Sequence, residues 1–337
     1  MRTETARLPV ESAAYHKLLE RAEEVTGAVH QATDLLNDSH PLLADTVRLI
    51  VKSAPDHDQP FGLLPYPVVE SLGGNPDLAL PLVTASRIWR AGAQVSDELA
   101  KGRYCAMVGG LLPGDAHVAS TACLTTIPLV AFDRSFLAPR LRAEWVREIT
   151  ESSLDGAERR LADRVGQFGA ASWKAAVYAC MSRAGIAYAR DAAMAARLAD
   201  ANDESVRGWR LFGRHLGVLR QLAAERAEAL LVSDTDLISG ANTALISHAN
   251  EMAKDGREKS ALLALRLRAQ HDASSRAEMR QYLETPRIVN SFNQRISAIQ
   301  RQLSGLLGDL IRPSSPKDLI HWMLDCSADD SRIPVRD

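Results

Sequence analysis

The most constraining feature of this sequence is a long apolar stripe near its end, with start and stop signals on either side. Thr285 is a capping residue type, Pro286 fits the first turn of a helix, and Pro313 would end one. Between them, apolar side chains recur at steps of three and four, which places them on one helical face. They are Ile288, Phe292, Ile296, Ile299, Leu303, Leu306 and Leu310. The pattern predicts a long helix whose apolar face packs into a core.

The same periodicity predicts helices elsewhere. It runs from Val10 to Leu36, and it resumes at Pro67 and from Asp77 to Ala91, after a stretch of turn formers at 53–60. Period-two alternation is scarce, and the strand-like segment 129–132 is too short to build a sheet. We therefore predict an all-α fold.

Composition indicates one large domain. Hydrophobic residues make up 46% of the 337 residues and aromatic residues only 5%, so the core must be built mainly from alanine, leucine, valine and isoleucine. No proline-, glycine- or serine-rich linker divides the chain. We predict a single helical domain over residues 1–326, followed by a polar C-terminal tail over residues 327–337.

Charge and targeting signals narrow the partners and the location. The net charge of −2 provides no field that would attract nucleic acid. We find no signal-peptide pattern at the start and no uninterrupted apolar stretch of about 18 residues, so we expect a cytoplasmic protein without a membrane span. Cys105, Cys123, Cys180 and Cys326 are isolated from one another, which predicts reduced core thiols.

Four segments follow one another in an order typical of a known family. The most specific is the run Phe212-Gly213, Leu216-Gly217 and Gln221; the others are 233–240 followed by Thr243, Asp97–Gly102, and Leu111–Asp115. In spacing and residue type they resemble motifs of the polyprenyl synthetase superfamily, and they cover roughly residues 50–250. The resemblance implies an isoprenoid synthase-like helical barrel.

Active members of that family join isopentenyl diphosphate to an allylic diphosphate, with Mg²⁺ held by two aspartate clusters on facing helices. Carboxylates at i, i+1 and i+4 share a helical face, and the hard cations they hold neutralise the leaving diphosphate. This sequence departs from the pattern. Residues 90–96, where the first cluster should lie, contain no carboxylate, and only Glu225 and Glu228 remain of the second. These two glutamates are the predicted metal ligands, and an acidic pair on a solvated helix face is the alternative.

The basic contacts of the family are partly kept. The resemblance places Lys101, Arg103 and Arg183, together with Gln221, where a diphosphate would bind. Each cation taken alone is better explained as a solvated surface charge, and only their joint placement favours a diphosphate site. The family's cationic stretch for isopentenyl diphosphate should fall near residues 52–60, where only Lys52 is basic.

Other chemistries find little support. The adjacent residues 56–58, Asp-His-Asp, do not converge on one ion in an extended loop. There is no GxSxG motif and no glycine-rich phosphate loop. Terpene cyclases share the fold, but the run 202–205 lacks the spacing of their second metal motif.

Two functions remain open. The first is a catalytically silent or weak subunit that pairs with an active prenyl diphosphate synthase and holds a prenyl diphosphate as ligand without ionising it. We expect either a homodimer or a heterodimer with such a synthase. An apolar lining with Ala91, Ala93 and Val95 would suit that role. The second is a divergent prenyltransferase or terpene synthase-like enzyme that uses Mg²⁺ at a degenerate site. The first function requires fewer of the family's motif residues to be intact than the second does.

Overall fold

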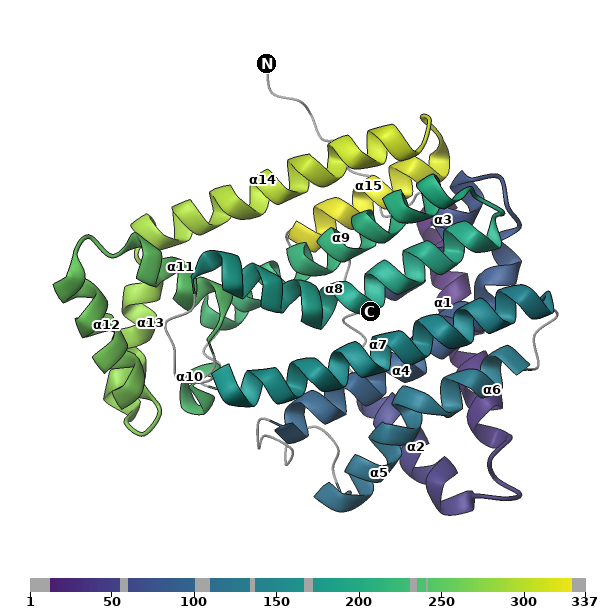
Figure 1. Ribbon diagram of the computed structural model, residues 1–337, viewed down its shortest axis with the longest axis horizontal. Coiled ribbons are helices and arrows are strands. Elements are labelled where there is room, and N and C mark those ends of the chain that lie inside the picture. Colours follow the sequence, from purple (N-terminus) through teal and green to yellow (C-terminus); the bar gives the residue numbers. More distant parts are fainter. Residues whose placement is uncertain are drawn as a thin grey trace.

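The computed structural model describes residues 13–54, 60–100, 110–133, 137–166, 172–230, 235–240 and 242–328. Across these ranges the chain is helical and contains no strand, which confirms the all-α prediction. Figure 1 shows long helices lying roughly alongside one another, with the short pair α12 and α13 at one end.

The helices of the first half are α1 (Ala13–Asp34), α2 (Pro41–Ser53), α3 (Pro65–Ser71), α4 (Leu80–Ala100), α5 (Pro113–Thr125), α6 (Ile127–Asp133) and α7 (Pro139–Gly166), with short 3-10 turns η2 (Phe61–Leu63) and η3 (Pro76–Ala79). Those of the second half are α8 (Trp173–Leu198), α9 (Asp203–Leu230), α10 (Thr235–Ser239), α11 (Ala244–Met252), α12 (Gly256–Ala269), α13 (Ala273–Leu283), α14 (Pro286–Leu310) and α15 (Ser315–Ala328).

Among the described helices, α8 and α9 share the most extensive contact, and glycine makes it possible. A Cβ atom added at Gly217 would lie 2.6 Å from the Ala184 carbonyl oxygen, and one added at Gly185 would lie 2.9 Å from the Arg214 carbonyl oxygen. Real Cβ atoms do not approach backbone so closely, so only glycine allows these two backbones to meet. The glycines of the 212–217 motif therefore serve helix packing, and the buried alanines of α8 widen the same contact.

The remaining helices enclose this pair. The first helix α1 packs on α4, α7 packs on α8, and α14 covers α9. Figure 1 shows α7 running across the front and α14 along the upper edge. The core between them is made of apolar side chains from nearly every helix, with Trp145, Trp209, Phe212 and Phe292 among the largest that are fully buried.

The predicted helix boundaries hold well near the C-terminus. The helix α14 spans Pro286–Leu310, as expected, although the Thr285 hydroxyl donates to the Tyr282 carbonyl instead of capping the helix. Residues 129–132 belong to α6, a helix. The last helix continues through Ala328, so Ser327 and Ala328 are helical and buried, although we predicted that the tail would begin at residue 327.

The stretch Pro113–Asp133, which covers α5 and α6, is the one part of the described chain with the length and composition of a membrane span. Core helices of globular proteins meet the same criterion. Of its central window, 44% is buried inside the fold, where α5 packs on α4 and α2. The expected cytoplasmic location stays a prediction.

Candidate functional site

The predicted site residues that the structure describes lie near the end of α9 and in the first half of α8. Gln221, Glu225 and Glu228 lie in the last turns of α9, and Arg183 lies in the first half of α8. The side chain of Glu228 lies outside the described part of the structure, as do Lys101, Arg103 and the acidic loop 56–58. The roles predicted for those residues stay predictions.

Glu225 is buried, with 6% of its surface exposed. Its Oε2 accepts the backbone N–H of Ala244 at 2.5 Å, and its Oε1 accepts from Gln221 Nε2 at 3.1 Å. The Cys180 Sγ also lies 3.9 Å from Oε1. One carboxylate therefore joins α8, α9 and the start of α11.

The bond to Ala244 serves a helix terminus. Ala244 is the first residue of α11, and Thr243 caps that helix by accepting the N–H of Ile246 at 3.2 Å. A carboxylate there meets an N–H group that has no intrahelical partner, at the positive end of the helix dipole. We predicted Glu225 as a metal ligand or as a solvated residue. It is not solvated, and its two oxygens already accept hydrogen bonds from the protein.

Burial shapes the electrostatics around Glu225. Desolvation raises its pKa, while the bonds from Gln221 and Ala244 and the charge of the nearby Arg183 oppose that rise. Desolvation also raises the pKa of the Cys180 thiol, with the Glu225 charge adding to the effect. A thiol in this environment stays protonated and unreactive. Cys123 and Cys326 are likewise buried and belong to no disulfide, as predicted, and Cys105 lies outside the described residues.

Asp97 is the carboxylate nearest in sequence to the missing first cluster, close to the C-terminal end of α4. Its Oδ1 pairs with Arg159 Nη2 of α7 at 2.7 Å and lies 3.5 Å from Arg160 Nη1. The Arg159 side chain is only 10% exposed. The charge of Asp97 is therefore balanced by two guanidinium groups of the neighbouring helix.

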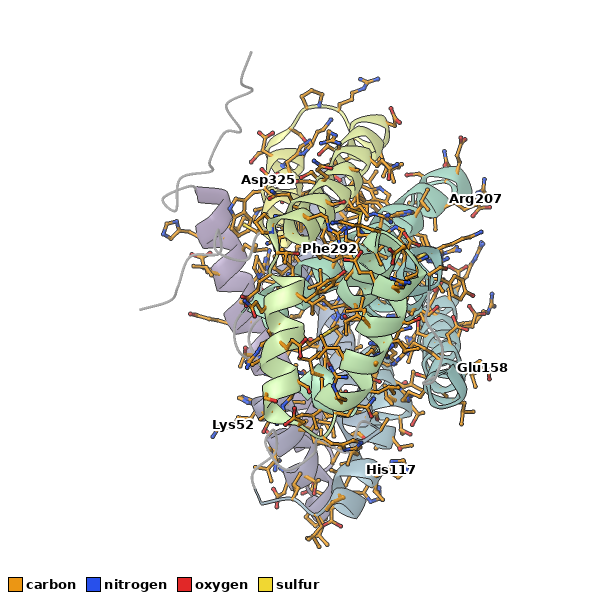
Figure 2. All side chains as sticks on the ribbon, turned by 90° about the vertical axis from the view of Figure 1, so that its left-hand side faces the viewer. Lys52, His117, Glu158, Arg207, Phe292 and Asp325 are labelled. Carbon is orange, nitrogen blue, oxygen red and sulfur yellow. The ribbon has the colours of Figure 1, made fainter. Side chains whose placement is uncertain are left out.

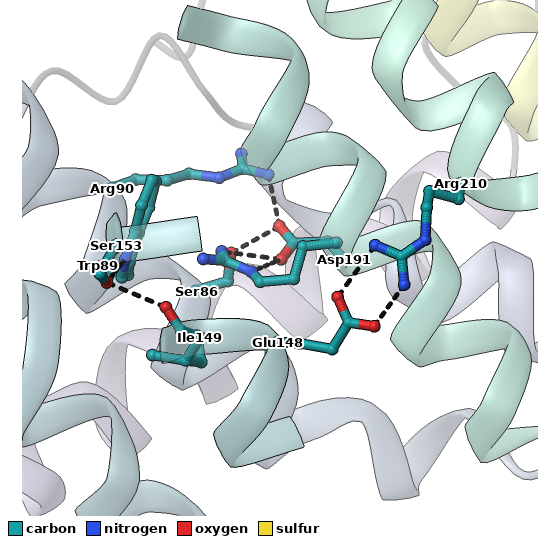
Figure 3. A network of polar contacts seen from close by, with 9 residues as sticks. Ser86, Trp89, Arg90, Glu148, Ile149, Ser153, Asp191 and Arg210 are labelled. Carbon is teal, nitrogen blue, oxygen red and sulfur yellow. Dashed lines mark hydrogen bonds and ion pairs between the residues drawn. The ribbon is translucent and has the colours of Figure 1, made fainter. Parts of the chain in front are cut away.

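A buried polar cluster that the sequence did not reveal joins α4 to α8, and Figure 3 shows Asp191 at its centre. Asp191 is fully buried, and its Oδ2 accepts from Ser86 Oγ at 2.5 Å and from Arg90 Nη2 at 2.6 Å. Its Oδ1 accepts from Arg190 Nε at 2.9 Å, and Arg190 Nη2 donates to Ser86 Oγ at 2.8 Å. We call Ser86, Arg90, Arg190 and Asp191 the α4–α8 cluster.

Aromatic rings complete this cluster. The Arg90 guanidinium lies 4.2 Å from the ring centroid of Tyr188, and that of Arg190 lies 4.5 Å from the ring centroid of Trp89. Burial lowers the pKa of Arg190, and the Asp191 charge opposes that shift. Planar guanidinium groups suit such stacked and paired positions.

A second ion pair ties α7 to α9 beside the α4–α8 cluster (Figure 3). Arg210 Nη1 donates to Glu148 Oε2 at 2.9 Å, and a second bond joins Arg210 Nη2 to Glu148 Oε1. The ion pairs of Asp97, Glu148 and Asp191 therefore cross-link the helices α4, α7, α8 and α9.

The fit of these residues to Mg²⁺ can be judged from the carboxylates. Mg²⁺ needs hard oxygen ligands in near-octahedral geometry and keeps several waters. Glu225 is buried and accepts two strong hydrogen bonds, and Asp97 is paired with arginine. Within the described ranges, no three His, Cys, Asp or Glu side chains come together in a way that could hold a metal. In these bonded arrangements Glu225 and Asp97 do not fit a magnesium site, and the predicted ligand pair of Glu225 and Glu228 stays a prediction.

The apolar lining that we predicted, with Ala91, Ala93 and Val95, stays a prediction. Ala91 and Val95 are buried and Ala93 is half-buried, but Arg90 is their neighbour on α4 and belongs to the α4–α8 cluster. Figure 2 looks onto the end of the molecule near α12 and α13, with Phe292 in the interior and the charged Lys52, Glu158 and Arg207 at the periphery. Lys52, the one cation expected near the isopentenyl site, is exposed.

The sequence carried one weak signal for the α4–α8 cluster. Arg190 and Asp191 stand side by side in a run of small apolar residues on α8, where charged residues are uncommon unless they are paired. Nothing in the sequence pointed to Ser86 and Arg90 as their partners, because these lie about one hundred residues earlier.

Comparison with known proteins rests on structure alone, because no protein-family model matches the chain and no curated protein has a matching sequence. A geranylgeranyl pyrophosphate synthetase from Pyrococcus horikoshii is similar, with a TM-score of 0.79, 14% identity, and coverage of 94% of this chain and 98% of that one. A polyprenyl synthase from Caulobacter crescentus, complexed with calcium and isoprenyl diphosphate, has a TM-score of 0.78, 13% identity, and coverage of 93% and 97%.

A third similar structure is a geranylgeranyl pyrophosphate synthase from Corynebacterium glutamicum, complexed with isoprenyl diphosphate and magnesium. It has a TM-score of 0.76, 14% identity, and coverage of 92% of this chain and 98% of that one. The similarity spans nearly the whole of each chain, which confirms the fold that the motif resemblance implied. This chain therefore has the all-helical isoprenoid synthase fold of the prenyl diphosphate synthases.

Proposed function

We propose that this chain is a divergent member of the polyprenyl synthetase superfamily that acts in isoprenoid biosynthesis as a catalytically silent or weak subunit, paired with an active prenyl diphosphate synthase. One observation carries the proposal. Two carboxylates near the expected metal positions, Asp97 of α4 and Glu225 of α9, are bound by the protein's own donors.

The reaction of the active enzymes depends on cations that neutralise the leaving diphosphate. Asp97 would have to give up Arg159 to bind Mg²⁺, and Glu225 would have to release the start of α11. Removing either partner leaves a buried or half-buried charge uncompensated, which is costly. The same side chains stabilise the barrel as it stands, so they favour a scaffold over a metal-dependent catalyst.

Exposed apolar side chains on α5 and α7 support a pairing role. Leu154 and Leu161 are 65% and 60% exposed and lie seven residues apart, on one face of α7. Val118 of α5 is 65% exposed, and Leu112 just before α5 is 68% exposed. Since α5 packs against α7, we define Leu112, Val118, Leu154 and Leu161 as the pairing surface, which a second prenyl synthase-like chain would cover.

The activity test uses the purified chain alone with Mg²⁺, isopentenyl diphosphate and a series of allylic diphosphates. We expect neither released diphosphate nor a prenyl product. Addition of the chain to an active prenyl diphosphate synthase of its source should change that enzyme's product length or stability. Turnover by the chain alone would contradict the silent-subunit proposal.

The pairing surface has its own test. In a mixture with an active prenyl diphosphate synthase, the double variant Leu154→Arg/Leu161→Arg should lose the mass of the complex in light scattering, because two buried charges would disrupt an apolar interface. Leu267→Arg, at a leucine of α12 that is somewhat less exposed at 54%, is the control. If the double variant and the control show the same mass as the wild type, the pairing surface is wrong.

The second candidate is the divergent enzyme, in which Glu225 and Glu228 hold Mg²⁺ and Lys101, Arg103 and Arg183 hold a prenyl diphosphate. It is supported by the placement of Arg183 close enough to Glu225 to influence the pKa of its carboxyl. Product formation in the activity test, lost in Glu225→Ala, would favour this candidate.

A further inference from the structure

The connection between α10 and α11 is bonded at both ends by buried side chains of opposite charge. At its start, Arg266 Nη2 of α12 donates to the Gly240 carbonyl at 2.7 Å. At its end, the Ala244 N–H donates to Glu225 Oε2 of α9 at 2.5 Å. The two side chains come from different helices and are 7% and 6% exposed.

Each charged side chain binds a backbone group of the opposite polarity. A guanidinium group binds a carbonyl oxygen and a carboxylate binds an N–H, and charge-assisted bonds of this kind are stronger than neutral ones. Gly240 has a φ of +67°, which favours glycine, and a Cβ atom there would lie 2.8 Å from Gln270 Nε2. The turn at Gly240 is therefore confined from several sides.

The helix that follows depends on such anchoring. Helix α11 has nine residues, and a helix of that length is unstable alone in water. Its first N–H is held by Glu225, and Glu225 is held in turn by Gln221 one helical turn earlier on α9. The Glu225 carboxylate therefore links the last turns of α9 to the first residue of α11.

We propose that Glu225 and Arg266 form a clamp that holds Gly240 and Ala244, the residues they bind, in one position relative to α9 and α12, whether or not Mg²⁺ and diphosphate are present. Glu225 is then a positioning residue for α11 and not a metal ligand. The clamp is independent of the proposed function, because a silent subunit and a weak enzyme would both contain it.

The test is amide hydrogen exchange on the full chain, measured across α11 with and without Mg²⁺ and inorganic diphosphate. Loss of a charge-assisted hydrogen bond should reduce the protection of the Ala244 amide about ten-fold or more, in both Glu225→Ala and Arg266→Met. The controls are Glu228→Ala, one turn further along α9, and Arg268→Met, whose exposed side chain lies on α12. We expect wild-type protection in both controls, and no effect of Mg²⁺ and diphosphate on the wild type.

Three results would overturn the clamp. One is wild-type protection of α11 in both Glu225→Ala and Arg266→Met. Another is a rise in the protection of α11 when Mg²⁺ is added to the wild type, if both Glu225→Ala and Glu228→Ala abolish that rise. A metal site would behave in this way. If Glu225→Ala does not fold, Glu225→Gln keeps one acceptor oxygen and should lose protection by a smaller factor. The third contradicting result is wild-type protection of α11 in both Glu225→Gln and Arg266→Met.

Discussion

Asp191 offers the most direct test of how this barrel is held together. It is fully buried and accepts hydrogen bonds from Ser86, Arg90 and Arg190. In Asp191→Asn the side chain keeps its shape but loses its charge, and one oxygen becomes an NH₂ group that faces donors. Arg190, itself 1% exposed, would then be a buried cation without a counterion. The replacement should therefore destabilise the fold strongly.

The magnitude follows from the burial. Breaking a buried ion pair by removing one partner costs about 3–5 kcal/mol. An unfolding entropy of about 2.1 cal/mol/K per residue, over the 337 residues, gives about 0.7 kcal/mol/K. The melting temperature should therefore fall by about 4–7 °C.

The assay is thermal unfolding of the wild type and Asp191→Asn, followed by circular dichroism and checked by calorimetry. Asp155→Asn, at an exposed position of α7, is the matched control and should change the free energy of unfolding by less than about 0.5 kcal/mol. If Asp191→Asn melts within about 1 °C of the control, the α4–α8 cluster does not stabilise the barrel as described here.

Two further predictions concern packing and pH. Gly217→Ala should push α8 and α9 apart and destabilise the fold by several kcal/mol in urea unfolding. The control Gly305→Ala lies on α14, where open space surrounds the added Cβ, and it should stabilise the fold by about 0.5–1 kcal/mol. Equal changes in the free energy of unfolding for the two variants would refute the close-contact argument. Burial lowers the pKa of His248 to about 4, so the unfolded chain binds a proton that the folded chain does not, and the free energy of unfolding should decrease as the pH falls from about 6.5 to about 4. His248→Phe should remove up to about 1.4 kcal/mol per pH unit of that slope, and an unchanged slope would rule out His248 as its source.

The helices were predictable from the sequence wherever their apolar residues are periodic. The stripe from Ile288 to Leu310 is local information, and it gave α14 with its observed bounds. The motif at 212–217 gave the fold by resemblance, and the structure supplies the physical reason, since Gly217 lets α9 meet α8.

The chemistry of the interior was not predictable in the same way. The sequence showed Glu225 as one of two acidic residues, but its partner Ala244 lies nineteen residues further along, after an intervening helix. Likewise, Asp191 meets Arg90 only because α4 and α8 cross inside the barrel. Whether a carboxylate binds a metal or a helix terminus depends on tertiary contacts that no local spacing encodes.

The most direct test of the account is a calorimetric titration of the purified chain with Mg²⁺ in the presence of inorganic diphosphate. If the carboxylates on α4 and α9 serve the fold, the heat should equal that of Mg²⁺ binding to diphosphate in buffer alone, with no further saturable binding by the protein, and Glu225→Ala should not alter it. Stoichiometric binding of Mg²⁺ and diphosphate that is lost in both Glu225→Ala and Glu228→Ala would contradict the account and establish a working metal site in this barrel.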